Sequence, residues 1–336
     1  MKNKFLVSKN FSNNDWNFVL DNSSDSNFSN TRDYYEFVTS FGYNPIVFCV
    51  YENNSPVAII NGFSFKGRFG IPFRLKLGDR FGPAVVIINS KKDDNSLKVF
   101  CKNFMLDIFK KNFFLYKFAY LPSEFAVESK FYCNVHIDLS KPHSIIMKNF
   151  KKSCRNAIAH SKRQCVNIIS SSSENAVREL LSNSYFCKTD YNDLFENKFF
   201  YELFRKFAKK GGAEIWIAYK DDYVLSLAII AKYKDKLSLC FLRSNSLGKK
   251  LKANNLLISE IAKKYACSNF SKFMIGGLGF DLHDELTGYG MFKKSFNPII
   301  QKAPLIKSIS KLEFLVRYYN FFFKKNFNKG LFFDSK

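Results

Sequence analysis

The stretch Ile46-Val-Phe-Cys-Val-Tyr-Glu-Asn-Asn-Ser-Pro-Val-Ala-Ile-Ile60 decides the fold class. It reads as an apolar strand, a short polar turn and a second apolar strand. Asn53 and Asn54 lie in the turn, and asparagine readily adopts the backbone conformations of tight hairpin turns. The stretch therefore predicts a β-hairpin.

The same pattern returns as Ile215-Trp-Ile-Ala-Tyr-Lys-Asp-Asp-Tyr-Val-Leu-Ser-Leu-Ala-Ile229. This second segment aligns Tyr219 with Tyr51 and places Asp221-Asp222 in the turn. Aspartate, like asparagine, favours such turns. The chain is therefore predicted to contain one hairpin unit twice.

Each hairpin leads to a helix and then to another strand. After the first hairpin, apolar residues at helical spacing predict a helix over roughly 96–111 and a strand over 115–120. After the second, the helix is predicted over 255–266 and the strand over 272–275. A repeat this long favours two copies of one α/β lobe over a solenoid. The alternative is that this order of elements recurs by chance, as it does in many α/β proteins.

The predicted fold class is thus α/β, with a mixed sheet of α+β character, in two tandem lobes at residues 1–140 and 141–302. One helix is predicted over 141–163, and two more over 174–186 and 194–209. Residues 303–336 are predicted to form a basic, aromatic C-terminal helix or tail. Such a helix either docks on the lobes or lies on an anionic membrane.

The composition limits the partners. The 336 residues carry 52 Lys and Arg against 29 Asp and Glu, a net charge of +23. Nucleic acid, phosphorylated small molecules and anionic membranes are all compatible with that charge. Forty Phe and seventeen Tyr exclude a disordered chain, because so much aromatic surface offsets the entropy of ordering.

Cysteine and histidine patterns argue against metal and disulfide chemistry. The eight cysteines form no C-x-x-C pair, which is typical of reduced residues in a cytoplasmic protein. The four histidines have no metal-ligand spacing, so no metal site is expected. No apolar run reaches the ~18 residues of a transmembrane helix. The expected location is the cytoplasm, with peripheral contact to the inner face of the membrane as a second option.

Four motifs follow one another in the predicted second lobe. They are Lys151-Lys-Ser-Cys-Arg-Asn-Ala-Ile-Ala-His-Ser-Lys162, Leu251-Lys-Ala-Asn-Asn-Leu-Leu-Ile258, Phe273-Met-Ile-Gly-Gly277 and Gly290-Met-Phe-Lys-Lys-Ser-Phe296. In this order they resemble the Fem-type peptidoglycan aminoacyltransferases and the FemAB-like acetyltransferases of the GNAT superfamily. The resemblance spans roughly residues 12–302.

The resemblance implies two tandem GNAT-like lobes and an N-acyltransferase. Such an enzyme moves an acetyl or aminoacyl group from a thioester or an aminoacyl-tRNA to a primary amine of a cell-envelope or amino-sugar precursor. No tightly bound cofactor is implied. The donor is acetyl-coenzyme A, another thioester or a charged tRNA, and the acceptor is a small or nucleotide-linked amine. The chemistry needs the amine held against the activated carbonyl and a donor for the developing oxyanion.

Lys293 is the candidate catalytic residue. The resemblance places the lysine of this Phe-Lys motif beside the substrate, where a fixed cation could stabilise the oxyanion or a substrate phosphate. A plain surface lysine is the alternative, and Lys294 beside it shows how common lysine is here. Phe292 is a candidate substrate contact that is equally suited to the core.

Three more candidates for substrate binding lie where a helix begins, at Lys252, Asn254 and Asn255. Asparagine is a good N-cap, and a helix N-terminus suits a phosphate group. Simple capping is the alternative. Single-lobe GNAT enzymes carry a glycine-rich loop at this place, whereas this segment has Gly248 alone, which puts a conventional coenzyme A site in doubt.

Arg155 is a further candidate, because it matches a motif position and a guanidinium suits phosphate geometry. It belongs to a basic segment with no acidic residue from Leu139 to Ser173. That segment could grip tRNA, a phosphorylated donor or anionic lipid, or could be a solvated basic face. A non-catalytic nucleic-acid-binding protein is therefore the competing function, and a duplicated lobe with a structural role is a third.

Two further segments bear on the acceptor. Peptidoglycan-acting relatives often carry an arginine shortly after a threonine, whereas this chain has Asn192 in Thr189-Asp-Tyr-Asn192. This departure weakens any expectation of the same nucleotide-linked acceptor. His283, Asp284 and Glu285 could accept a proton from the amine or could simply begin a helix.

Overall fold

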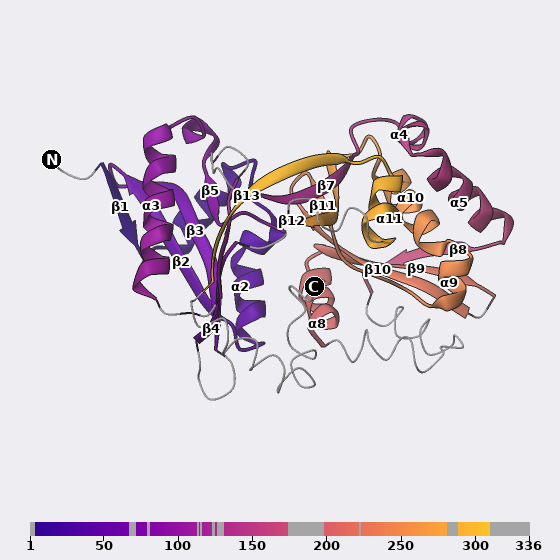
Figure 1. Cartoon of the computed structure of the whole chain (residues 1–336), viewed down its shortest axis with the longest axis horizontal. Helices are drawn as coiled ribbons and strands as arrows, with labels where there is room; N and C mark the ends of the chain where they lie inside the picture. Colours follow the sequence, from indigo (N-terminus) through magenta and orange to yellow (C-terminus); the bar gives the residue numbers. More distant parts are fainter. Residues whose placement is uncertain are drawn as a thin grey trace. The chain divides into compact units, whose positions relative to one another are not determined.

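A computed structural model gives the chain as two compact units, which we call the first and second lobes (Figure 1). The structure describes residues 4–66, 72–78, 81–112, 114, 116–122, 125, 131–173, 198–221, 223–280 and 288–309. The first lobe comprises residues 1–130 together with 303–336, and the second comprises residues 131–302. This division falls ten residues before the predicted boundary after residue 140, because β7 (Phe131–Asp138) pairs with a strand of the second lobe.

The first lobe is a mixed sheet with helices on both faces. Figure 1 shows α2 and α3 on opposite faces of that sheet. Its described elements are β1 (Phe5–Ser8), α1 (Asn13–Asp21), the 3₁₀ turn η1 (Phe28–Asn30), α2 (Arg32–Thr39), β2 (Asn44–Glu52), β3 (Ser55–Lys66), β4 (Pro72–Leu77), β5 (Val85–Ile87), the 3₁₀ turn η3 (Asn89–Lys91), α3 (Asn95–Lys111), β6 (Tyr116–Tyr120) and β13 (Ile299–Ile309), whose first four residues fall in the range of the second lobe.

The second lobe has the same kind of layers. Its described elements are β7, α4 (His143–Asn149), α5 (Lys152–Arg163), β8 (Asn167–Ser171), α8 (Lys198–Ala208), β9 (Ala213–Lys220), β10 (Tyr223–Tyr233), β11 (Lys236–Ser244), α9 (Ser246–Lys250), α10 (Ala253–Tyr265), β12 (Lys272–Phe280) and α11 (Gly288–Ser295). Helices α4, α5 and α10 share one apolar core with one face of the sheet.

The two sheets repeat one pairing scheme. In the first lobe the strands run in the order β1-β2-β3-β4-β6-β13, and in the second the order is β8-β9-β10-β11-β12-β7. In both, the fourth and fifth strands pair in parallel and the other neighbours pair antiparallel. The last strand in each order comes from outside the repeated hairpin–helix–strand unit. The predicted internal repeat and mixed sheet are therefore confirmed.

Both predicted hairpin turns are present. Asn53 and Asn54 have φ angles of 50° and 63°, and Asp221 has 51°, which are the left-handed values that a type I′ turn requires. The asparagine and aspartate residues at these positions therefore adopt the left-handed backbone conformation that the turns need.

Two element predictions differ from the structure. The single helix expected over 141–163 is two helices, because the backbone is extended at Phe150 and Lys151, where α4 ends and α5 begins. Residues 303–309, expected to open the C-terminal helix, belong to β13, and Leu305 to Ile309 pair with β6. Pairing with β6 gives the backbone groups of this segment their hydrogen-bond partners, which favours a strand over a helix here. Residues 310–336 and 174–197 lie outside the described residues.

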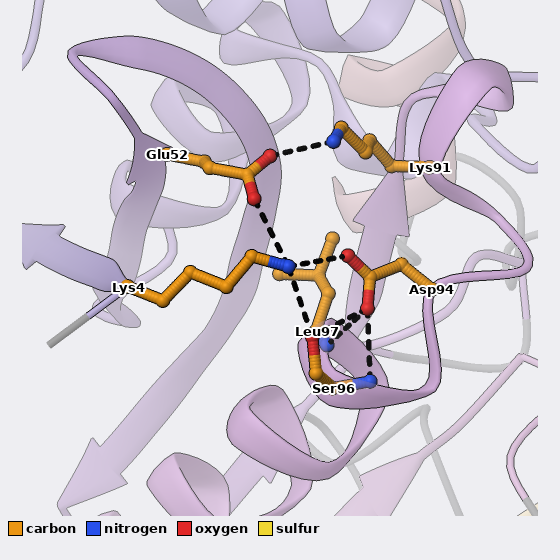
Figure 2. Close-up of polar contacts among 6 residues, drawn as sticks. All are labelled: Lys4, Glu52, Lys91, Asp94, Ser96 and Leu97. Atoms are coloured by element: carbon orange, nitrogen blue, oxygen red, sulfur yellow. Dashed lines mark hydrogen bonds and ion pairs between the residues drawn. The ribbon is translucent and has the colours of Figure 1, made fainter.

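Figure 2 shows a cluster of charged residues that connects Lys4 with Glu52 and Asp94 within the first lobe. The ammonium of Lys4 lies 3.1 Å from Glu52 and 3.2 Å from Asp94, and the ammonium of Lys91 lies 2.6 Å from Glu52. Asp94 also caps α3 by accepting the N–H groups of Ser96 and Leu97. The cluster therefore links β1, β2 and the start of α3.

No helix in the described part of the chain is long and apolar enough to cross a membrane.

Candidate active site

The site predicted at Lys293 lies where the pairing of β12 becomes irregular. On one side β12 pairs in parallel with β11 only from Lys272 to Met274 among the described residues. On the other side its register against β7 shifts between Met274 and Gly276 and again after Gly277. Gly276 has a φ of 99°, a conformation that side chains other than glycine rarely adopt. The glycine pair thus marks the point where β12 leaves the regular sheet.

Lys293 reaches this glycine pair from the last turn of α11. Its side chain is 3% exposed, and its ammonium donates a hydrogen bond to the carbonyl of Gly277. A Cβ at Gly276 would lie 3.1 Å from the ammonium nitrogen, so the missing side chain leaves room for the charge. Burying an ammonium is costly unless it is paired. The fold therefore holds a cation at a defined place.

The ring of Tyr289 forms one side of the lysine site. The ammonium of Lys293 lies 3.9 Å from the ring centroid, which is a close cation–π contact. The two residues are one turn apart on α11, the spacing at which helical side chains meet. Because Tyr289 is 54% exposed, the cation is separated from solvent by a ring that is itself accessible.

A second tyrosine reaches the same glycine pair from β7. A Cβ at Gly277 would lie 2.3 Å from the hydroxyl oxygen of Tyr132, so Tyr132 occupies the space over this glycine. Tyr132 and Tyr289 were not among the site residues predicted from the sequence. The spacing of Tyr289 and Lys293 on one helix was a usable signal, whereas the approach of Tyr132 depends on strand register.

The candidates at the start of α10 are placed differently from the prediction. The N-cap is Lys252, with a φ of 58°, and the helix begins at Ala253, so neither Asn254 nor Asn255 caps it. Asn254 accepts a hydrogen bond from the Ser226 hydroxyl, and the buried Asn255 donates to the Cys154 thiol at 3.6 Å. Both asparagine side chains therefore form hydrogen bonds with residues of other elements, while the Lys252 side chain is exposed.

Gly248 is a packing residue in α9. A Cβ there would lie 2.1 Å from the Leu225 carbonyl oxygen, and the Gly248 N–H donates to the Asn245 side chain at 2.7 Å. The segment between β11 and α10 is thus a short helix whose only glycine is closely packed.

Arg155 is exposed, but its guanidinium is engaged. It donates to the Lys148 carbonyl at 3.1 Å and to the carbonyl of Phe150. These carbonyls end α4, where an arginine commonly satisfies the last acceptors. Its suggested part in substrate binding stays a prediction.

The side chain of Cys154, in the first of the four motifs, contacts residues of two of the others. Its buried thiol contacts Asn255 of α10 and Ser295 of α11, and burial raises its pKa. A thiol with a raised pKa is a poor nucleophile at neutral pH. Phe292 is half-buried and meets Phe296 edge-to-face at 5.1 Å, which places it against the core. The motifs on α5, α10 and α11 therefore meet at one place in the second lobe.

Three predicted positions cannot be placed, because His283, Asp284 and Glu285 lie outside the described residues, as does Thr189–Asn192. Among the described residues, no group of three or more His, Cys, Asp or Glu side chains is arranged to hold a metal ion.

Comparisons with known proteins support the fold. No family model matches the sequence, and a search of curated proteins finds no match either. Among solved structures, FemX matches with a TM-score of 0.63 at 8% identity, covering 93% of this chain and 99% of FemX. The C-terminal domain of a protein assigned as a lysylphosphatidylglycerol synthetase, from Agrobacterium fabrum, matches with a TM-score of 0.52 at 10% identity, covering 91% of this chain and 96% of that domain.

A conserved protein of unknown function from Bacteroides thetaiotaomicron also matches, with a TM-score of 0.50 at 12% identity over 90% of this chain and 99% of that protein. At such identities the likeness concerns the fold. The chain therefore has a FemX-like fold built from two similar lobes, as its motifs predicted.

Proposed function

We propose that this protein is an N-acyltransferase. It transfers an acetyl or aminoacyl group from a thioester or an aminoacyl-tRNA to a primary amine of a cell-envelope or amino-sugar precursor. The observation that carries the proposal is the buried ammonium of Lys293, fixed by the Gly277 carbonyl and the Tyr289 ring. The likeness to FemX over nearly the whole chain supports the fold that the motif resemblance implies for this reaction class.

In the proposed reaction, the amine nitrogen forms a bond to the activated carbonyl carbon, and the carbonyl oxygen becomes an oxyanion. The Lys293 ammonium stabilises that oxyanion. As the intermediate collapses, the carbon–sulfur bond of a thioester or the carbon–oxygen bond of an aminoacyl ester breaks. The proton that the amine loses ends on the departing sulfur or oxygen, which leaves as a thiol or a hydroxyl. A preorganised donor in a site shielded from water is effective in such chemistry.

The segment before α10 bears on the choice of acyl donor. Gly248 packs against the Leu225 carbonyl, and its N–H donates to the Asn245 side chain. This glycine therefore has no free N–H to bind a pyrophosphate. An aminoacyl-tRNA therefore stands beside acetyl-coenzyme A as a donor to test. The envelope acceptor rests on the motif resemblance and on the name of the Agrobacterium fabrum relative, which describes an aminoacylated phospholipid.

The test incubates the purified protein with acetyl-coenzyme A or charged tRNA and a panel of amines, namely an amino sugar, a lysine-containing peptide and an aminoalkyl phospholipid. Mass spectrometry follows the acylated product. Replacing Lys293 by Met should lower the rate about 10²–10³-fold, the usual loss for one oxyanion donor. The matched control is Lys294→Met, which removes the neighbouring charge and should retain the wild-type rate. A folded Lys293→Met protein with full activity would contradict the proposal.

A second candidate function is nucleic-acid binding without catalysis. The observation in its favour is that Lys151, Lys152, Lys162 and Arg163 are exposed on or beside α5. Lys162 also lies 3.3 Å from Glu260. This function predicts RNA or DNA binding that weakens steeply with salt and survives Lys293→Ala. Binding titrations at two salt concentrations with that variant separate the two functions.

A further inference from the structure

A hollow of about 660 Å³ opens in the first lobe, in a part of the chain that the proposed reaction does not use. It lies between the loop before α1, the helices α1 and α2, and the first residues of β2. Its volume falls within the range of pockets that bind small molecules.

The hollow exists because β1 turns away from β2 early. Their pairing ends at Ser8 opposite Cys49. The Ser8 hydroxyl then donates to the Asn10 carbonyl at 2.6 Å and accepts the Asn10 N–H at 3.1 Å, which closes a tight turn. Beyond that turn, Pro45, Ile46 and Val47 of β2 line the hollow. An edge of the sheet is therefore exposed to a ligand at this point.

Aromatic rings form the floor of the hollow. Trp16 and Tyr35 are 9% and 5% exposed, and their rings meet edge-to-face at 5.6 Å. Their polar atoms are used inside the protein, because the Trp16 N–H donates to the Asn30 carbonyl at 2.9 Å and the Tyr35 hydroxyl donates to Asn61 at 2.8 Å. The remaining surface of these rings is apolar, so the floor favours an apolar ligand body.

The rim carries two cations and one carboxylate. Arg32 is fixed by an ion pair with Glu36 at 2.9 Å and by a hydrogen bond to Asn13. Lys9 lies with its ammonium 5.2 Å from the centroid of the Phe48 ring. The charged groups lining the hollow therefore sum to one positive charge, which complements a single negative charge.

We propose that this hollow binds an amphipathic monocarboxylate, a ligand with an aromatic or aliphatic body and one carboxylate. The body lies on Trp16 and Tyr35 beside Ile46, and the carboxylate is held by Lys9 at the rim. A phosphate monoester fits less well, because its charge of about −1.5 to −2 exceeds the rim charge and meets Glu36. The site is independent of Lys293 and of the proposed transfer reaction.

The test uses phenylacetate as the probe, with phenethylamine and phenethyl alcohol as probes of the same size and different charge. Equilibrium dialysis with the wild-type protein should show saturable binding of phenylacetate, at least threefold tighter than that of either analogue. Lys9→Met should remove this preference for the anion while leaving binding of the alcohol unchanged. Lys110→Met, a charge removed from the exposed end of α3, should keep the preference.

Fluorescence gives a second readout, because the chain has two tryptophans and Trp216 belongs to the other lobe. In a Trp216→Phe variant, phenylacetate should change the emission of Trp16 with the same dissociation constant as dialysis. Thr39→Phe, which fills the rim, should abolish both signals. Absence of saturable binding in dialysis would overturn the proposal, as would equal affinity for the carboxylate and the amine.

Discussion

Each lobe buries a lysine against a tyrosine, and the two pairs differ in what lies beyond the ring. In the first lobe, Lys76 on β4 is fully buried with its ammonium 4.9 Å from the Tyr120 ring, and Tyr120 is 2% exposed. In the second lobe, Lys293 lies 3.9 Å from Tyr289, which is 54% exposed. The first ammonium is enclosed within its lobe, whereas the second is separated from solvent by one accessible ring.

Two lobes with the same strand order need not carry the same side chains at corresponding places. Both sheets have the same strand order and directions. The first lobe places its lysine on a strand within the sheet, whereas the second brings its lysine from a helix onto an irregular glycine pair. We therefore expect the chemistry in the second lobe.

The largest expected effect on stability concerns one glycine in each lobe that packs against the backbone carbonyl of a strand. A Cβ at Gly62 would lie 2.2 Å from the Lys76 carbonyl oxygen, and one at Gly248 would lie 2.1 Å from that of Leu225. Backbone must move to relieve either clash, so Gly62→Ala and Gly248→Ala should each cost about 2–4 kcal/mol in urea unfolding. Gly288→Ala, with nothing within 4 Å of its Cβ, is the control and should be nearly neutral. Equal stability of all three variants would refute the packing role.

The next effect concerns the buried polar network of the first lobe. Asn61 is 1% exposed and accepts hydrogen bonds from Tyr35 at 2.8 Å and Asn30 at 3.1 Å. Asn61→Ala leaves those donors buried without this acceptor and should cost about 2 kcal/mol in the free energy of unfolding. Asn44→Ala, an exposed position on β2, should change it little. An Asn61→Ala protein as stable as Asn44→Ala would contradict this assignment.

A smaller effect is expected at Tyr289, whose ring contacts the Lys293 ammonium. Tyr289→Leu removes the cation–π contact of Lys293 and should lower the acyl-transfer rate about fivefold, corresponding to about 1 kcal/mol. Tyr289→Phe keeps the ring face and should retain most of the activity. If Phe and Leu behave alike, the ring is not what holds the ammonium.

The smallest effect is the pH dependence of the cluster in Figure 2. Hydrogen bonds from Lys91 and Lys4 lower the pKa of Glu52 in the folded protein. Its stabilisation is therefore present above the ordinary carboxyl value of about 4.3 and is lost as the pH falls below it. The melting temperature of Glu52→Gln should lie slightly below that of the wild type at pH 7, and the gap should narrow as the pH falls through the lowered pKa of Glu52. A gap that widens on acidification would contradict this sign.

Local patterns predicted much of the fold and one part of the site. The asparagine turn at Asn53-Asn54 and the helical spacing over 96–111 carry their own signals, and both appear in the structure. Lys293 was found because its neighbours form a motif. The break between α4 and α5 and the pairing of β13 with β6 depend on tertiary contacts, which short windows of sequence do not record.

The same limit applies to the side chains at the site. Asn254 and Asn255 have the right chemistry for capping, but Ser226 and Cys154 engage them after folding. Tyr132 approaches Gly277 through strand register, which sequence spacing does not reveal.

The most direct test compares the two buried lysines in one assay. Lys293→Met and Lys76→Met are made in the full chain, their folding is checked by circular dichroism and thermal melting, and acyl transfer to the amine panel is measured. We expect a loss of about 10²–10³-fold for Lys293→Met and a rate within about threefold of wild type for Lys76→Met. Equal losses in the two variants, or an unchanged rate in a folded Lys293→Met protein, would contradict it.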